Sequence, residues 1–284
     1  MSNQERGQEA LDTLSKALKG RERAEKRRPL AVVAMSAVAI LAIVGGIWFL
    51  ATRDSEEDVV ADGASTSAEP TQEAHFEQLS MQRSQPLPET VTCTYDSAGQ
   101  AAKQVATPEG ANVPARGHVG VTLETAQGPI GMTLDRATAP CTTNAIEHLA
   151  KEKYFDGTVC HRLTTSGIFV LQCGDPSGKG SGGPGFQFAN EYPTDEAAAD
   201  KQQTPVTYPR GSIAMANAGK DTNGSQFFLN YKDSPLPPQY TYFGQISEDG
   251  LKTLDKIAEA GVAGGQTDGK PAEEVRINSA RVEG

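Results

Sequence analysis

The chain has 284 residues and a formal net charge of −10 at pH 7. The length is compatible with one or two domains, and the acidic balance argues against a nucleic-acid partner, because proteins that hold phosphates need clustered Lys and Arg. The four Cys are an even number, and whether they pair depends on whether the compartment is oxidising.

The first predicted element is a membrane-spanning helix over residues 30–50. This stretch has no charged residue, and its 21 residues form a helix of about 31 Å, the thickness of the hydrocarbon core of a bilayer. Six Lys and Arg precede it within residues 19–28, so the positive-inside rule places the N-terminus in the cytoplasm and the rest of the chain outside. A cleavable signal peptide is the alternative, but its apolar core would be shorter, at about 7–15 residues. We therefore expect a basic cytoplasmic tail over 1–29 and a retained single-pass anchor in the cell membrane over 30–51.

Two segments then precede the folded domain. Residues 52–90 are rich in Ala, Ser, Thr, Glu and Pro and show no periodic pattern, which predicts a disordered linker. Residues 91–116 contain Cys93 and Tyr95 but little periodicity, so we expect an extension that lies on the surface of the domain. The domain itself is expected over 117–284, which has enough Val, Ile, Leu and Phe for one core.

Short strands outnumber helices within the predicted domain. Residues 118–125 and 130–135 alternate apolar and polar side chains on either side of a Gly-Pro turn, which is the pattern of a hairpin. A Pro opens a predicted helix over 140–151, and apolar residues at helical spacing predict a second helix over about 251–260. The remaining strands are expected within 160–173, 211–215, 226–230, 240–246 and 275–282. About eight strands and two helices predict a mainly β domain, an antiparallel barrel with capped ends.

The sequence argues against several kinds of catalytic site. Neither Ser166 nor Ser225 lies in a G-x-S-x-G context, and the four His are scattered without metal-ligand spacing. The Gly-rich loop over 174–185 contains a G-x-G-x-x-G pattern, but no helix follows it to hold a pyrophosphate. Neither a metal nor a cofactor is implied. What remains is the stretch 160–173, where a single strong cation, Arg162, lies beside apolar residues. This pattern fits either a surface Arg on an edge strand or a shallow apolar pocket with one fixed hydrogen-bond donor.

Three stretches resemble the cyclophilin-type peptidyl-prolyl cis–trans isomerases: CHRLTTSGIFVLQCGD at 160–175, GSIAMANAGKDTNGSQFFL at 211–229, and LPPQYTYFGQI at 236–246. The resemblance covers about 117–284, and the overall layout is similar to the membrane-anchored bacterial branch of the family. It implies a closed eight-stranded antiparallel barrel capped by two helices. It also implies a monomeric catalytic domain that isomerises X–Pro bonds in proline-containing segments of exported or cell-envelope proteins. The alternative is a cyclophilin-like module that binds proline peptides with little turnover.

The resemblance also implies the residues of the site. Arg162 matches the catalytic arginine of the family, which donates a hydrogen bond to the nitrogen of the twisted X–Pro amide and weakens its resonance. The implied substrate-binding residues are His161, Phe169, Val170, Gln172, Met215, Ala216, Asn217, Ala218, Gln226, Phe228, Leu236 and Tyr240. Two additional residues lie in the turn between Arg162 and Phe169, and Pro235 replaces a Trp that other members carry near the pocket. Strict alternation would put Phe169 and Gln172 on opposite faces, so a bulge is expected between them.

The four cysteines suggest two disulfides on the oxidising side of the membrane. Cys160 and Cys173 lie directly opposite each other if their strands form a hairpin with a two-residue turn. We therefore expect the pairs Cys160–Cys173 and Cys93–Cys141. The second pair would fasten the extension to the first helix.

Overall fold

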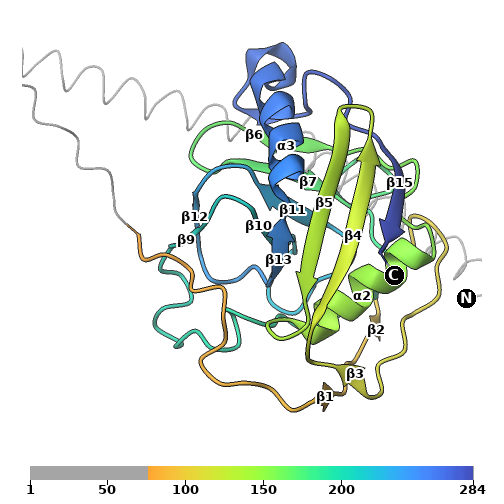
Figure 1. Cartoon of the computed structure of the whole chain (residues 1–284), viewed down its shortest axis with the longest axis vertical. Coiled ribbons are helices and arrows are strands. Elements are labelled where there is room, and N and C mark those ends of the chain that lie inside the picture. The colour runs from red at the N-terminus through yellow and green to blue at the C-terminus, as the bar shows by residue number, and fades with distance from the viewer. Residues whose placement is uncertain (1–75, 284) are drawn as a thin grey trace, which may run out of the picture. The chain divides into compact units, whose positions relative to one another are not determined.

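The computed structural model describes residues 76–283, which form a mainly β fold with two α-helices (Figure 1). The predicted tail over 1–29, the predicted anchor over 30–51 and the first part of the predicted linker lie outside the described residues. Between residues 76 and 283, no helix combines the length and the apolar character needed to cross a membrane.

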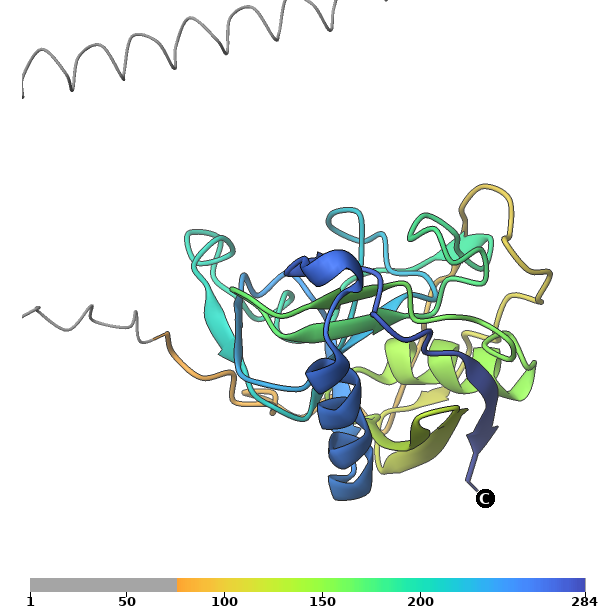
Figure 2. The ribbon, with the colours of Figure 1, turned by 90° about the horizontal axis from the view of Figure 1, so that it is seen from above.

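One antiparallel sheet of nine strands builds most of the fold, and Figures 1 and 2 show how it curls. Its strands, from one edge to the other, are β14 (Asp268–Gly269), β6 (Arg162–Thr164), β7 (Val170–Cys173), β11 (Phe227–Asn230), β10 (Ser212–Met215), β13 (Tyr242–Ile246), β5 (Gly128–Asp135), β4 (His118–Thr125) and β15 (Ile277–Val282). Three smaller sheets pair β1 (Thr90–Val91) with β3 (Val113–Pro114), β2 (Asp96–Ser97) with β8 (Phe186–Gln187), and β9 (Val206–Tyr208) with β12 (Ser234–Leu236).

The large sheet is an open half-barrel, because its edge strands β14 and β15 do not pair with each other. The two ends meet where the segment before β6 lies against the start of β15, through a single bridge between Val159 and Arg276 and not through a ladder of strands. The amides of Gly157 and Cys160 donate to the carbonyls of Ile277 and Val275, and the amide of Ile277 donates to Thr158, each at 2.8 Å. One edge of β6 pairs with β7 and the other with β14, so β6 itself cannot pair with β15. Only the segment before β6, residues 157–160, reaches the other end of the sheet. The expected closed barrel of eight strands is therefore wrong in both its closure and its strand number.

Alternating side chains place the main core inside the curled sheet. In β4, Val119, Val121 and Leu123 are buried, and the residues between them are more exposed. β5 lies directly opposite and buries Ile130 and Leu134 on the same side. The predicted hairpin is confirmed, since its strands and its short turn follow from this alternation alone.

Two helices pack on this core, α2 (Pro140–Lys151) and α3 (Glu248–Ala260), and a short exposed 3₁₀ segment, η1 (Ala263–Gly265), follows α3. α2 has its Pro in the first turn and buries Ile146 and Leu149. It lies against β4 and β15, whereas α3 lies against β5 (Figure 2). α3 begins three residues earlier than predicted. Ser247 caps it, accepting a hydrogen bond from the amide of Gly250 at 3.1 Å.

Residues 76–90 pack on the domain, so the predicted linker is wrong for this part of the chain. Leu79 is only 6% exposed, and its amide donates to the carbonyl of Thr207 at 2.9 Å. The guanidinium of Arg83 donates to the carbonyl of Thr138 at 2.8 Å. These partners lie far away in the sequence, and a composition that is poor in apolar residues gives no sign of them.

Both expected disulfides are present, Cys93–Cys141 and Cys160–Cys173. The first fastens the extension over 91–116 to the start of α2. The second joins the segment before β6 to the end of β7. Both of its cysteines are buried next to the stretch that carries Arg162.

Candidate active site

A pocket of about 190 Å³ opens where β6, β7, β11 and β12 meet the segment that follows β10. It is lined by Arg162, Ile168, Val170, Gln172, Ala216, Asn217, Phe228, Leu236 and Tyr240. Most of these side chains are apolar, and Arg162 is the one cation among them. The site is therefore an apolar pocket with a charged hydrogen-bond donor at its rim; we call it the first pocket.

The apolar side of the first pocket follows from the pairing of β7 with β11. Gln172 lies directly across from Phe228, and Val170 lies two residues before Gln172, so all three side chains share one face of the sheet. Leu171 points the other way, into the main core. The ring of Tyr240 meets that of Phe228 edge to face, with 5.6 Å between the ring centroids.

A single carboxylate holds the guanidinium of Arg162. Its Nε and Nη2 donate to the two carboxylate oxygens of Asp268, both at 2.7 Å, because β14 brings Asp268 beside β6. The third nitrogen, Nη1, is 3.4 Å from Oε1 of Gln172. The hydrogen bonds between the two side chains raise the pKa of Arg162 and lower the pKa of Asp268. Arg162 thus stays charged, and its Nη1 is left to contact a ligand.

A chain of amides connects Arg162 to the Gly-rich loop. Nε2 of Gln172 donates to Oε1 of Gln226 at 3.0 Å, and Nε2 of Gln226 donates to the carbonyls of Gly180 and Gly182 at 3.1 and 3.0 Å. The carboxylate of Asp175 accepts hydrogen bonds from the amides of the same two glycines at 2.7 and 3.0 Å. Burial raises the pKa of Asp175, but these and neighbouring hydrogen bonds outweigh burial and lower it. The Gly-rich loop beside the pocket is therefore held in place by the side chains of Asp175 and Gln226.

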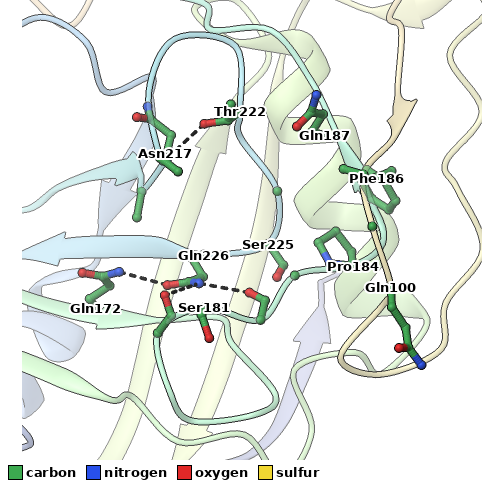
Figure 3. A pocket seen from close by; sticks show the side chains of 18 residues that line it. Gln100, Gln172, Ser181, Pro184, Phe186, Gln187, Asn217, Thr222, Ser225 and Gln226 are labelled. Carbon is green, nitrogen blue, oxygen red and sulfur yellow. Dashed lines mark hydrogen bonds between the residues drawn. The ribbon is translucent and has the colours of Figure 1, made fainter. Parts of the chain in front are cut away.

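A second pocket, of about 440 Å³, adjoins the first and shares Gln172, Ala216 and Asn217 with it (Figure 3). Of the predicted substrate-binding residues, Ala218 and Gln226 line this second pocket and not the first. Within residues 76–283, no group of His, Cys, Asp or Glu is arranged to hold a metal ion.

Three predicted site residues do not reach either pocket. Phe169 packs on the main core, with its ring centroid 6.0 Å from that of Tyr231. Met215 is fully buried in the same core. His161 is half-buried beside Gly180, and burial lowers its pKa. The other predicted residues do line the first pocket: Arg162, Val170, Gln172, Ala216, Asn217, Phe228, Leu236 and Tyr240.

The pocket position expected for Phe169 is occupied by Ile168. Ile168, Val170 and Gln172, each two residues apart, all line the first pocket, and the pairing of β7 with β11 over Val170–Cys173 shows no bulge. Within β7, which begins at Val170, the structure therefore shows no bulge of the kind expected. The IFVLQ pattern alone would have selected Ile168.

Asp268 is the second residue that the sequence analysis missed. It lies 106 positions from Arg162 in the sequence, and its two-residue strand has no recognisable pattern. Only the pairing of β14 with β6 brings the two side chains together. No feature of the sequence would have indicated it.

Residues 120–282 match the profile of the family described as cyclophilin type peptidyl-prolyl cis-trans isomerase/CLD. A protein of Mycobacterium tuberculosis (strain CDC 1551 / Oshkosh) named probable peptidyl-prolyl cis-trans isomerase B is 56% identical over 192 residues, which cover 66% of this chain and 62% of that protein. The chain thus spans less than two thirds of that relative's length. The protein of the same name from Mycobacterium leprae (strain TN) is 52% identical over 198 residues, covering 68% and 67%. A crystal structure of a cyclophilin type isomerase of Cryptosporidium parvum superposes with a TM-score of 0.49 at 29% identity, covering 59% of this chain and 99% of that one.

Proposed function

The chain belongs to the cyclophilin-type peptidyl-prolyl cis–trans isomerases, and we propose that its domain catalyses rotation about X–Pro peptide bonds. Such bonds populate both isomers but exchange only in tens to hundreds of seconds, because the partial double bond sets a barrier of about 18–20 kcal/mol. The observation that carries the proposal is the placement of Arg162. Its Nη1 is a permanent donor beside an apolar pocket, and Asp268 keeps the guanidinium in place.

In the proposed mechanism, the proline ring occupies the apolar part of the first pocket, against Phe228 and Leu236. At the rim, the NH2 groups of Gln172 and Asn217 each give one hydrogen bond within the protein, and their second N–H donates to the substrate backbone. As the X–Pro amide twists, its nitrogen becomes pyramidal and gains a lone pair, to which Nη1 of Arg162 donates a hydrogen bond. This bond stabilises the twisted amide more than either planar isomer, so it lowers the barrier without a covalent step.

The test is the isomerisation of a proline tetrapeptide by the full chain and by Arg162→Ala. We expect kcat/KM to fall at least about thirtyfold, which corresponds to about 2 kcal/mol of transition-state stabilisation. The matched control is Arg210→Ala, because Arg210 makes a similar two-bond ion pair with Asp255 at 2.8 and 2.9 Å, away from both pockets. An Arg162→Ala protein that is folded and retains full kcat/KM would overturn the mechanism.

A proline-peptide binding module with little turnover is the second candidate. It is favoured by one observation: two of the three guanidinium nitrogens of Arg162 donate to Asp268 and the third, Nη1, also donates to Gln172, so the guanidinium is already held by partners in the protein. Wild-type protein that binds proline peptides in a titration but shows no turnover would support this candidate instead.

For the whole chain, we propose a membrane-tethered enzyme that acts on exported proteins outside the cytoplasm. Support comes from the uncharged run over 30–50, the basic cluster before it, and two disulfides, which persist in oxidising compartments. Protease added to cells stripped of their wall should digest the domain and leave the N-terminal tail protected. Protection of the domain until the membrane is permeabilised would contradict the proposed orientation.

A further inference from the structure

The second pocket is continuous with the first, because the two share Gln172, Ala216 and Asn217. It is also the larger of the two, with about 440 Å³ against about 190 Å³. A peptide whose proline occupies the first pocket therefore presents a nearby side chain to the second. The chemistry of the second pocket decides which side chain that is.

The side chains that line the second pocket include amides and hydroxyls but no charged group. The amides of Gln172 and Gln226 are already bonded to each other and to the Gly-rich loop. Within residues 76–283, three lining side chains have no hydrogen-bond partner and can accept or donate to a ligand: Gln100, Ser181 and Gln187.

One wall of this pocket comes from the extension, through residues 98–100, and not from the barrel. Figure 3 shows Gln100 beside Pro184, on the side of the pocket away from Asn217. These residues precede the part of the chain that matches the family profile, 120–282. The wall therefore lies outside the part of the chain that matches the family profile.

The extension is fixed where it lines the pocket. β2 pairs with β8, and the amides of Ala98 and Ala102 each donate at 2.9 Å to a carbonyl of the Gly-rich loop. The ring of Tyr95 packs edge to face on Phe186, with 5.7 Å between centroids. The disulfide to α2 anchors the segment just before Tyr95. A wall held in this way can discriminate between ligands without having to be ordered first.

We propose that residues 98–100 are a specificity element of the isomerase, which selects a polar, uncharged side chain near the substrate proline. An amide or hydroxyl side chain can bond to one of Gln100, Ser181 and Gln187, whereas an apolar side chain gains no hydrogen bond there. A charged side chain would lose hydration without meeting an opposite charge. The inference rests on the proposed function, because it assigns a second binding position to the same site.

The experiment uses the full chain and proline peptides in which one residue near the proline is Asn, Ala, Asp or Lys, placed on either side in turn. At one of these positions we expect the wild type to show the highest kcat/KM with Asn. Gln100→Glu should then shift the ratio of kcat/KM for the Lys peptide over the Asp peptide about tenfold upwards, and Gln100→Lys should shift it downwards. The matched controls are Gln104→Glu and Gln104→Lys, because Gln104 is exposed on the same extension outside the pocket.

Equal ratios in the wild type and both Gln100 variants would overturn the inference, as would the same shift in the Gln104 variants. Peptide dissociation constants, measured by titration, separate this failure from failure of the proposed function. Wild-type protein without turnover, whose peptide affinities still respond to the charge at Gln100, would retain the specificity element and reject the isomerase. Normal turnover whose peptide preference does not respond to the Gln100 substitutions would retain the isomerase and reject the specificity element.

Discussion

Removing Asp268 should lower the activity of this cyclophilin while leaving its stability almost unchanged. The two hydrogen bonds at 2.7 Å fix the plane of the Arg162 guanidinium and leave Nη1 at the pocket. Without them the long side chain spreads over several staggered rotamers. If about one rotamer in ten places Nη1 correctly, kcat/KM falls about tenfold in Asp268→Ala, or about 1.4 kcal/mol. Asp268→Asn keeps one acceptor and should lose only about threefold, in the same tetrapeptide assay.

Stability should respond much less, because the side chains of Arg162 and Asp268 are 40% and 54% exposed. An exposed ion pair contributes about 0–1 kcal/mol to the free energy of unfolding. Asp255→Ala is the matched control: it breaks the Arg210 pair, which is similarly exposed at 39% and 43%, and should leave kcat/KM unchanged. Full activity, or higher activity, in Asp268→Ala would refute the view that this carboxylate positions the donor.

The sign of the pH dependence follows from the lowered pKa of Asp268. A carboxylate with a lowered pKa in the folded protein keeps its interaction above its ordinary pKa of about 3.9 and loses it as the pH falls through the lowered value. The ion pair should therefore be complete from pH 7 down to about pH 5. We expect the ratio of wild-type to Asp268→Ala activity to stay constant over that range.

Three further predictions test the site and its supports. Ile168→Ala should raise KM for a proline peptide several-fold, whereas Phe169→Ala should lower the melting temperature with little effect on KM; the opposite pattern would reject the register. Asp175→Asn should cost about 1–2 kcal/mol of unfolding free energy at pH 7. That difference should vanish as the pH falls through the lowered pKa of Asp175, so equal urea midpoint shifts at pH 7 and pH 3 would contradict it. Replacing Cys160 and Cys173 by Ser should cost about 3 kcal/mol, because the disulfide removes the closure entropy of the loop between two residues that are 13 positions apart; a loss below about 1 kcal/mol in urea titrations would argue against it.

Local patterns in the sequence were sufficient for the elements that depend on neighbouring residues. The β4–β5 hairpin follows from side-chain alternation, and the start of α2 follows from its Pro. The open sheet could not be predicted in this way. Its two ends meet through residues 157–160 and 275–277, and that contact depends on β14 pairing with β6. The packing of residues 76–90 likewise depends on residues that are far away in the sequence, such as Thr138 and Thr207.

The site was predictable to the extent that its residues lie in the recognised stretches. Phe228, Leu236 and Tyr240 reach the first pocket because their segments have the expected register. The resemblance places Phe169 in the pocket, whereas the alternation along residues 168–172 places Ile168 there, and Ile168 is the residue that lines it. Asp268 could not be predicted from the sequence, since a carboxylate 106 positions away from Arg162 leaves no local pattern.

The pairing of β6 with β7 shows why the hydrogen-bond donor and the apolar pocket belong to one unit. Arg162 lies directly across from Gln172 in the pairing of β6 with β7, so each strand contributes one polar group to the same rim. The disulfide between Cys160 and Cys173 joins the two strands next to this pair, while Asp268 restrains the guanidinium from β14. The covalent link fixes the separation of the strands, and the ion pair fixes the plane of the donor. A hydrogen bond lowers a barrier most when its donor is already in place, and the disulfide and the ion pair together supply that condition for Arg162.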